Sequence, residues 1–136
     1  MAGDRPTDDV IGALLDELER AGFARRRWFE LFAQYQPARM RLWFETRRKL
    51  RDECVELDQK TVEFIIVALD AAANWPQIDA HIDRAFDCGA TIQELIDVCV
   101  ITSNTKGPHA LAAGLDGLDR VIEERRRLGK PVPPSG

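Results

Sequence analysis

The sequence has too few cysteines for a disulfide-stabilised secreted domain. It contains three in 136 residues, Cys54, Cys88 and Cys99, and an odd number at wide spacings does not make a disulfide framework. The segment from Met1 to Pro6 lacks the apolar run of a signal peptide. We therefore expect a cytoplasmic protein whose thiols are free and mostly buried.

An excess of positive charge and a long apolar run are also lacking. The chain carries 19 Lys and Arg against 23 Asp and Glu, which gives a net charge of −4. Binding to phosphate backbones requires an excess of cations. No apolar stretch approaches the ~20 residues of a membrane-spanning helix. We therefore expect neither nucleic acid nor a membrane as a partner.

Apolar residues recur with helical periodicity in most of the sequence, and residues that typically start or end helices are frequent. No segment has a convincing strand pattern. The sequence predicts an all-α bundle of about six to seven helices. The length suits one core, so we expect a single domain over residues 1–128. Residues 129–136 are rich in Pro and Gly and are expected to form a flexible tail. The predicted helices span residues 7–20, 23–35, 37–54, 58–73, 76–88, 91–101 and 108–128.

Several helix ends are marked by single residues. Asp58 is a good N-cap, and Thr91 opens a capping-box pattern. Gly89 suits a left-handed helix terminator, and Pro108 suits the first turn of the last helix. Residues 102–107 are polar and are predicted to form the turn between the last two helices.

Two helices have distinctive core patterns. The run from Phe64 to Leu69 is apolar on all sides, which predicts a helix that is buried on most faces. In the last helix, small residues at Gly114 and Gly117 permit close backbone approach. The core positions expected in that helix are Leu111, Leu115, Leu118 and Ile122.

A longer pattern covers roughly half of the chain. Its first part is Leu57–Ile65, and its strongest part is His81–Thr91 followed by Glu94–Val98. There a histidine-bearing helix precedes a Gly-Ala-Thr turn and a helix with an acidic capping residue. In these positions the segment 57–121 resembles the carboxymuconolactone decarboxylase-like superfamily, which has the alkylhydroperoxidase D-like fold.

The resemblance implies a homo-oligomer, a trimer or hexamer, that acts without a cofactor. It implies decarboxylase chemistry, or a related lyase or isomerase step, on a small organic acid. Redox members of the family carry a Cys-x-x-Cys pair one turn before the histidine, and the matching positions here are Asn74 and Gln77. Cys88 and Cys99 do not restore that spacing.

Three functions remain open at this point. Peroxide reduction needs a low-pKa attacking thiol and a resolving partner, so a thiol peroxidase is the least favoured. The decarboxylase branch also lacks the cysteine pair, so an enzyme of that type is the leading interpretation. The alternative is a non-catalytic, oligomeric ligand-binding protein on the same scaffold.

The candidate catalytic residues are two histidines and two carboxylates. His81 and His109 can each transfer a proton near neutral pH. Glu63 and Asp70 are seven residues apart, so their directions on a helix differ by about 20°. The resemblance places Glu63 in a proton relay with His81. The ordinary alternative is that both carboxylates pair with arginines from the third helix or from another subunit.

The candidate substrate-binding residues are cations and one aromatic. Lys106 precedes a helix N-terminus, where free N–H groups favour a carboxylate. Arg39 and Arg41 are alternative carboxylate clamps, although a solvated helix face is the simpler interpretation. Trp75 lies just before the histidine-bearing helix, and could equally pack in a core or an interface. No metal site is predicted.

Overall fold

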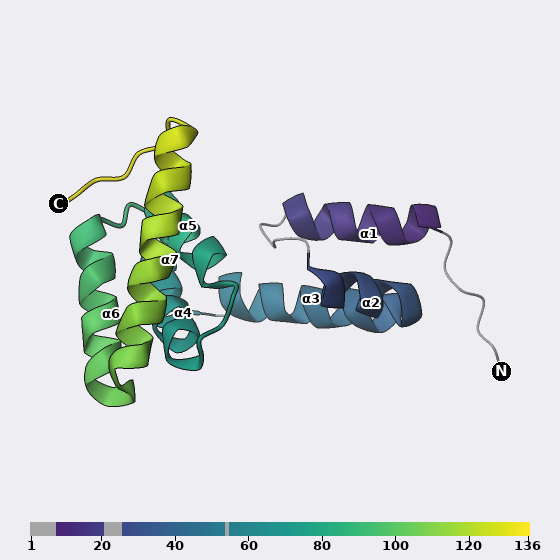
Figure 1. Ribbon diagram of the computed structural model, residues 1–136. Coiled ribbons are helices and arrows are strands. Elements are labelled where there is room, and N and C mark those ends of the chain that lie inside the picture. Colours follow the sequence, from purple (N-terminus) through teal and green to yellow (C-terminus); the bar gives the residue numbers. More distant parts are fainter. Residues whose placement is uncertain (1–7, 21–25, 54) are drawn as a thin grey trace. The chain divides into compact units, whose positions relative to one another are not determined.

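The computed structural model describes residues 8–20, 26–53 and 55–136, and within these ranges it is all-helical (Figure 1). This confirms the predicted all-α class for the part of the chain described. None of the described helices is both long and apolar enough to cross a membrane. The described residues form seven helices, α1 (Asp8–Arg20), α2 (Arg27–Tyr35), α3 (Pro37–Asp52), α4 (Gln59–Ala73), α5 (Ile78–Asp87), α6 (Ile92–Lys106) and α7 (Pro108–Arg127).

The chain divides into two compact units, Met1–Val55 with α1 to α3 and Glu56–Gly136 with α4 to α7. The boundary lies beside Leu57, where the family-like segment was expected to begin. A single domain over residues 1–128 stays a prediction. The predicted helix starts at residues 7 and 23 and the predicted helix end at residue 54 lie outside the described residues.

The N-terminal unit has its own small core. Leu14 and Leu18 of α1 are 1% and 2% exposed, and they belong to one apolar cluster with Phe29 of α2 and Phe44 of α3. Val10 lies one turn before Leu14 on the same side of α1, but it is 50% exposed. The buried side of α1 therefore begins after its first turn.

The C-terminal unit builds its core from all four of its helices. Val67 of α4, Ile82 of α5, Leu95 of α6 and Leu118 of α7 belong to one buried cluster. Such a core needs each helix to present one continuous apolar face. The helices α6 and α7 run side by side along this unit (Figure 1).

Four of the residues predicted to mark helix ends in this unit are confirmed. The Asp58 carboxylate accepts a hydrogen bond from the backbone N–H of Thr61 at 2.8 Å, so it caps α4. Thr91 forms a complete capping box at the start of α6. Gly89 has φ of +91°, and Pro108 is the first residue of α7. These signals are local, which is why the sequence alone reveals them.

The predicted polar turn at residues 102–107 is wrong. α6 continues to Lys106, and only Gly107, with φ of +99°, separates it from α7. The hydroxyls of Thr102 and Ser103 each donate to a backbone carbonyl of the preceding turn at 2.7 Å. The helix thus satisfies these hydroxyls internally, and their polarity does not end it. A smaller difference is at Pro76, which precedes α5 instead of forming its first turn.

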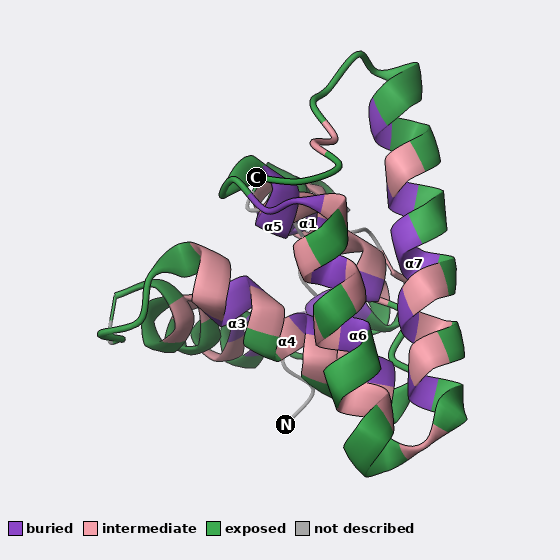
Figure 2. Cartoon of the chain, turned by 90° about the vertical axis from the view of Figure 1, so that its left-hand side faces the viewer, coloured by how far each residue is buried: buried purple, intermediate pink, exposed green. Residues whose placement is uncertain are grey.

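The buried face of α7 differs from the predicted one. Of the four predicted core positions, Leu118 is buried, and Leu115 and Ile122 are partly buried against the same core cluster. A Cβ added at Gly117 would lie 3.1 Å from the side chain of Ile78, so the two helices approach through glycine. The buried residues of α7 are Ala110, Gly114, Gly117, Leu118, Val121 and Arg125. Figure 2 shows the buried side of α7 facing the rest of the C-terminal unit.

The expectation that α4 is buried on most faces is wrong for the single chain. Its buried residues lie on one side and include Val67 and Ala71. On the other side, Ile65 is 46% exposed and Leu69 is 63% exposed. The outer face of α4 is therefore apolar and open.

The expected C-terminal tail lies against the start of α6. The backbone N–H groups of Ile92 and Gln93 donate to the carbonyls of Pro133 and Pro134 at 2.8 and 3.1 Å. These N–H groups belong to the first turn of α6 and have no acceptor inside the helix. The tail carbonyls therefore complete the capping of α6.

Candidate functional site

Glu63 of α4 and His81 of α5 form the central contact of the candidate site. The distance between Glu63 Oε2 and His81 Nδ1 is 2.7 Å. The side chains are 4% and 13% exposed respectively. A short contact between a buried carboxylate and an imidazole is characteristic of charge-assisted hydrogen bonds. The structure therefore brings together two of the predicted site residues from different helices.

Packing of α4 on α5 explains why the carboxylate is buried. Glu63 and Val67 are one helical turn apart, so they occupy the same face of α4. Val67 enters the core of the C-terminal unit together with Ile82, the residue after His81. The same apolar contact that joins the helices thus carries Glu63 and His81 out of solvent.

The Glu63 contact determines which imidazole nitrogen is available. A carboxylate can only accept, so the Nδ1–H of His81 donates to Glu63. The other ring nitrogen, Nε2, is then the atom that can exchange a proton with a ligand. An orienting carboxylate of this kind fixes both the tautomer and the ring direction.

Arg84 is a third member of the site that the sequence analysis missed. Its Nη1 lies 3.9 Å from Glu63 Oε1, and its side chain is 23% exposed. Arg84 follows His81 by three residues, so both side chains project from one side of α5. That spacing was the available signal, but the sequence analysis did not single out Arg84.

Asp70 is not part of the Glu63–His81 contact. It follows Glu63 by two helical turns, which separates their backbones by about 10 Å along the axis. The backbone carbonyl of Asp70 accepts from the N–H of Trp75 at 2.8 Å, where α4 ends. Asn74 leaves the helix with a left-handed φ of 50°.

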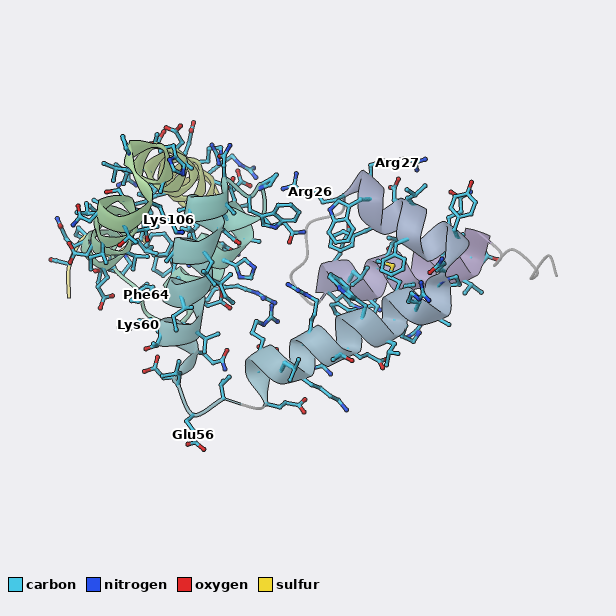
Figure 3. The ribbon with its side chains drawn as sticks, turned by 90° about the horizontal axis from the view of Figure 1, so that it is seen from below. Arg26, Arg27, Glu56, Lys60, Phe64 and Lys106 are labelled. Carbon is cyan, nitrogen blue, oxygen red and sulfur yellow. The ribbon has the colours of Figure 1, made fainter. Side chains whose placement is uncertain are left out.

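His109 lies at the opposite end of α4 from Glu63. Its Nε2 donates to the carbonyl of Ala72 at 3.3 Å, about 13 Å along the helix from Glu63. Lys106, at the end of α6, is exposed. In Figure 3 it is set apart from Lys60 at the start of α4. The structure thus separates the predicted anion site from the Glu63–His81 contact.

The remaining predicted ligand-binding residues are all exposed. Arg39 and Arg41 belong to α3 in the N-terminal unit. Arg41 pairs with Glu17 of α1 at 3.0 Å, so part of its charge is already neutralised. Trp75 is 44% exposed in the turn before α5, and so it is not a core residue of the chain.

Thiol chemistry is poorly supported at the two described cysteines. Burial raises the pKa of Cys99. The pKa of Cys88 is raised by burial first and by the negative charges of Glu63 and Asp87 next. Since the thiolate is the attacking species, a raised pKa weighs against a peroxidatic thiol. Among the described residues, no group of three or more His, Cys, Asp or Glu side chains could hold a metal ion.

Comparison with known proteins adds no assignment to this geometry. No protein-family model matches the chain, and no curated protein or solved structure matches it significantly.

Proposed function

We propose that the C-terminal unit is a cofactor-independent acid–base catalyst of the carboxymuconolactone decarboxylase-like type. The substrate is a small organic acid, and the reaction is a decarboxylation or a related lyase or isomerase step. The observation that carries this proposal is the 2.7 Å contact between buried Glu63 and His81. The residue pattern of positions 57–121 supports the family, and the helical architecture agrees with it.

His81 acts as the proton carrier through Nε2. In a decarboxylation, the bond between carbon and carboxylate breaks, CO2 leaves and the electron pair stays on carbon. Protonated His81 then delivers its Nε2 proton to that carbon and regains a proton from solvent. In an isomerisation, neutral His81 removes a proton from one carbon and returns it to another. General acid–base catalysis of this kind contributes about 10²–10⁴-fold to the rate.

Glu63 orients His81 for the proton transfer. The carboxylate lies where the imidazolium charge appears, and it is held by a buried helix face. Arg84 offsets the negative charge that Glu63 brings into the packed site. A fixed partner charge of this type lowers the reorganisation needed during proton transfer.

The test is turnover by His81→Gln with carboxymuconolactone, measured as CO2 release and as loss of substrate. We expect loss of at least about 100-fold in rate with an unchanged helical circular dichroism spectrum. His109→Gln, compared in parallel, distinguishes the two histidines, because His109 lies at the other end of α4. Full activity of His81→Gln on a substrate that the protein turns over would refute the assignment.

A second candidate function is a non-catalytic, oligomeric ligand-binding protein. The observation that favours it is the exposed apolar surface of the C-terminal unit, where Leu69 is 63% and Ile101 is 67% exposed. Apolar surface of this kind is typical of subunit interfaces. We infer a homo-oligomer, a trimer or hexamer, that covers it.

Light scattering of the purified chain tests the oligomer. We expect Leu69→Glu to reduce the mass to that of a monomer, because a buried charge without a partner opposes association. Lys130→Glu, at an exposed position outside the helices, is the control and should leave the mass unchanged. A monomeric wild-type protein at high concentration would contradict the inference.

A further inference from the structure

A groove opens on the N-terminal unit between α1 and α3. Its volume is about 530 Å³, within the range of about 300–1,000 Å³ that small-molecule sites usually occupy. Every residue that lines it belongs to the N-terminal unit. The lining residues are Glu17 and Arg20 of α1 and Phe44, Glu45, Arg48 and Lys49 of α3.

Helix packing explains why these side chains meet. The helices α1 and α3 lie side by side (Figure 1), and Leu14 of α1 belongs to one apolar cluster with Phe44 of α3. Arg48 follows Phe44 by four residues, so it lies on the same side of α3 one turn later. The ion pair between Arg41 and Glu17, at 3.0 Å, joins the two helices one turn earlier. Apolar packing and this ion pair therefore hold both walls of the groove.

The groove contains an excess of positive charge. Arg20, Arg48 and Lys49 form no ion pair with any residue that the structure describes. Glu17 is already paired with an arginine outside the lining. Glu45 is the remaining acid, so the cations exceed it by two charges. Like charges gathered in a concave site raise the local concentration of the opposite ion.

The helix dipoles explain only part of this charge. Arg20 and Lys49 lie in the last turns of α1 and α3, where a cation stabilises the end of a helix. Arg48 lies before the last turn of α3 and is half-buried. Burial of a charge without a counter-ion is unfavourable. An anionic ligand in the groove would supply that counter-ion.

We propose that the groove between α1 and α3 binds a small phosphate monoester. Such a group carries a charge of about −1.5 to −2 near neutral pH, which matches the excess of positive charge. The planar guanidinium groups of Arg20 and Arg48 donate hydrogen bonds to phosphate oxygens, and Lys49 adds a point charge. A carboxylate, with one charge, leaves part of the excess uncompensated. The site lies in the other unit from the Glu63–His81 contact and does not rest on the proposed function.

The test is calorimetric binding of glycerol 3-phosphate to the full chain, with uncharged glycerol and singly charged glycerate as controls. We expect saturable binding of the phosphate, binding of glycerate weaker by at least about tenfold, and no binding of glycerol. Removal of a charge-assisted hydrogen bond by Arg20→Gln or Arg48→Gln should raise the Kd at least about tenfold. Arg47→Gln is the matched control on α3 and should leave the Kd unchanged, because Arg47 stacks on Trp43 and does not line the groove.

Thermal unfolding separates ligand binding from stabilisation of the helix ends. Arg48→Gln should leave the melting temperature of the ligand-free protein unchanged, because it removes no ion pair and lies before the last turn. Glycerol 3-phosphate should raise the melting temperature of the wild type and of Arg47→Gln more than that of Arg48→Gln. If Arg20→Gln fails to fold because it weakens the end of α1, Arg48→Gln still decides the question.

Four results overturn the site. The first is an absence of saturable binding of glycerol 3-phosphate, and the second is equally tight binding of glycerate. The third is an equal loss of affinity in Arg47→Gln and Arg48→Gln, which would show that only the general charge of α3 attracts the anion. The fourth is a loss of phosphate binding in His81→Gln, because His81 takes no part in this groove.

Discussion

Replacing Gly114 with alanine in α7 sets helix propensity against steric overlap. Alanine is favoured over glycine in a helix interior by about 1 kcal/mol. However, a Cβ at position 114 would overlap the Sγ of Cys99, which is buried at 1% exposure. Overpacking of this kind costs about 1–3 kcal/mol. We therefore expect Gly114→Ala to destabilise the C-terminal unit by about 1 kcal/mol.

Removal of the sulfur should reverse the sign of this effect. In a Cys99→Ala background, the nearest atoms to the new Cβ are the Cβ of residue 99 at 3.1 Å and that of Ala71 at 3.6 Å. The helix preference for alanine then dominates, and Gly114→Ala should stabilise by about 0.5 kcal/mol. The corresponding double-mutant cycle should show a coupling of about 1.5 kcal/mol.

Native-state hydrogen exchange in α7 measures the free energy of opening of this unit directly. Gly12→Ala in α1 is the control, because no atom lies within 4 Å of the Cβ that it adds. That variant should stabilise α1 by helix propensity alone. A stabilising Gly114→Ala in the wild-type background, or a coupling below about 0.5 kcal/mol, would refute the packing argument.

Two further predictions concern charge. The pKa of Glu94 is held below its usual 4.5 by the backbone N–H of Thr91 and then by Lys60. Its contribution to stability is therefore present above pH 4.5 and lost as the pH falls through the lowered pKa. Glu94→Gln should cost less than about 1 kcal/mol at pH 7 in urea unfolding, because the pair is partly exposed, and the difference from wild type should vanish in acid. A difference that persists at low pH would contradict this. Glu63→Gln should lower the raised pKa of Cys88, since Glu63 is one of its causes after burial. Alkylation of Cys88 at pH 8 should then be faster by less than about tenfold, and an unchanged rate would show that the two groups do not interact.

Local signals in the sequence were sufficient for the helices and for most of their ends. Asp58, Thr91 and Pro108 act on the backbone of their own first turn, so no distant residue is needed to interpret them. The polar stretch after Val100 was misinterpreted for the opposite reason. Its hydroxyls have two possible acceptors, solvent or the preceding helical turn, and the sequence does not distinguish them.

Apolar periodicity predicted which faces of helices are buried only where one stripe dominates. In α7 the leucine stripe and the glycine stripe are neighbours. Gly114 and Gly117 are buried, whereas Leu115 and Ile122 of the leucine stripe are only partly buried against the core. Which side of α7 is buried depends on how closely α5 and α6 approach it, and this distance is set by the packing of the three helices together.

An all-helical class for the described part of the chain, most helix caps, and a histidine and a carboxylate suited to proton transfer could all be predicted from the residues alone. The contact between Glu63 and His81, the neighbouring Arg84, and the separate positions of Asp70 and His109 emerge only in the folded chain. Helical spacing relates residues only within a few turns of one another. Which faces of different helices come together depends instead on packing of the whole core.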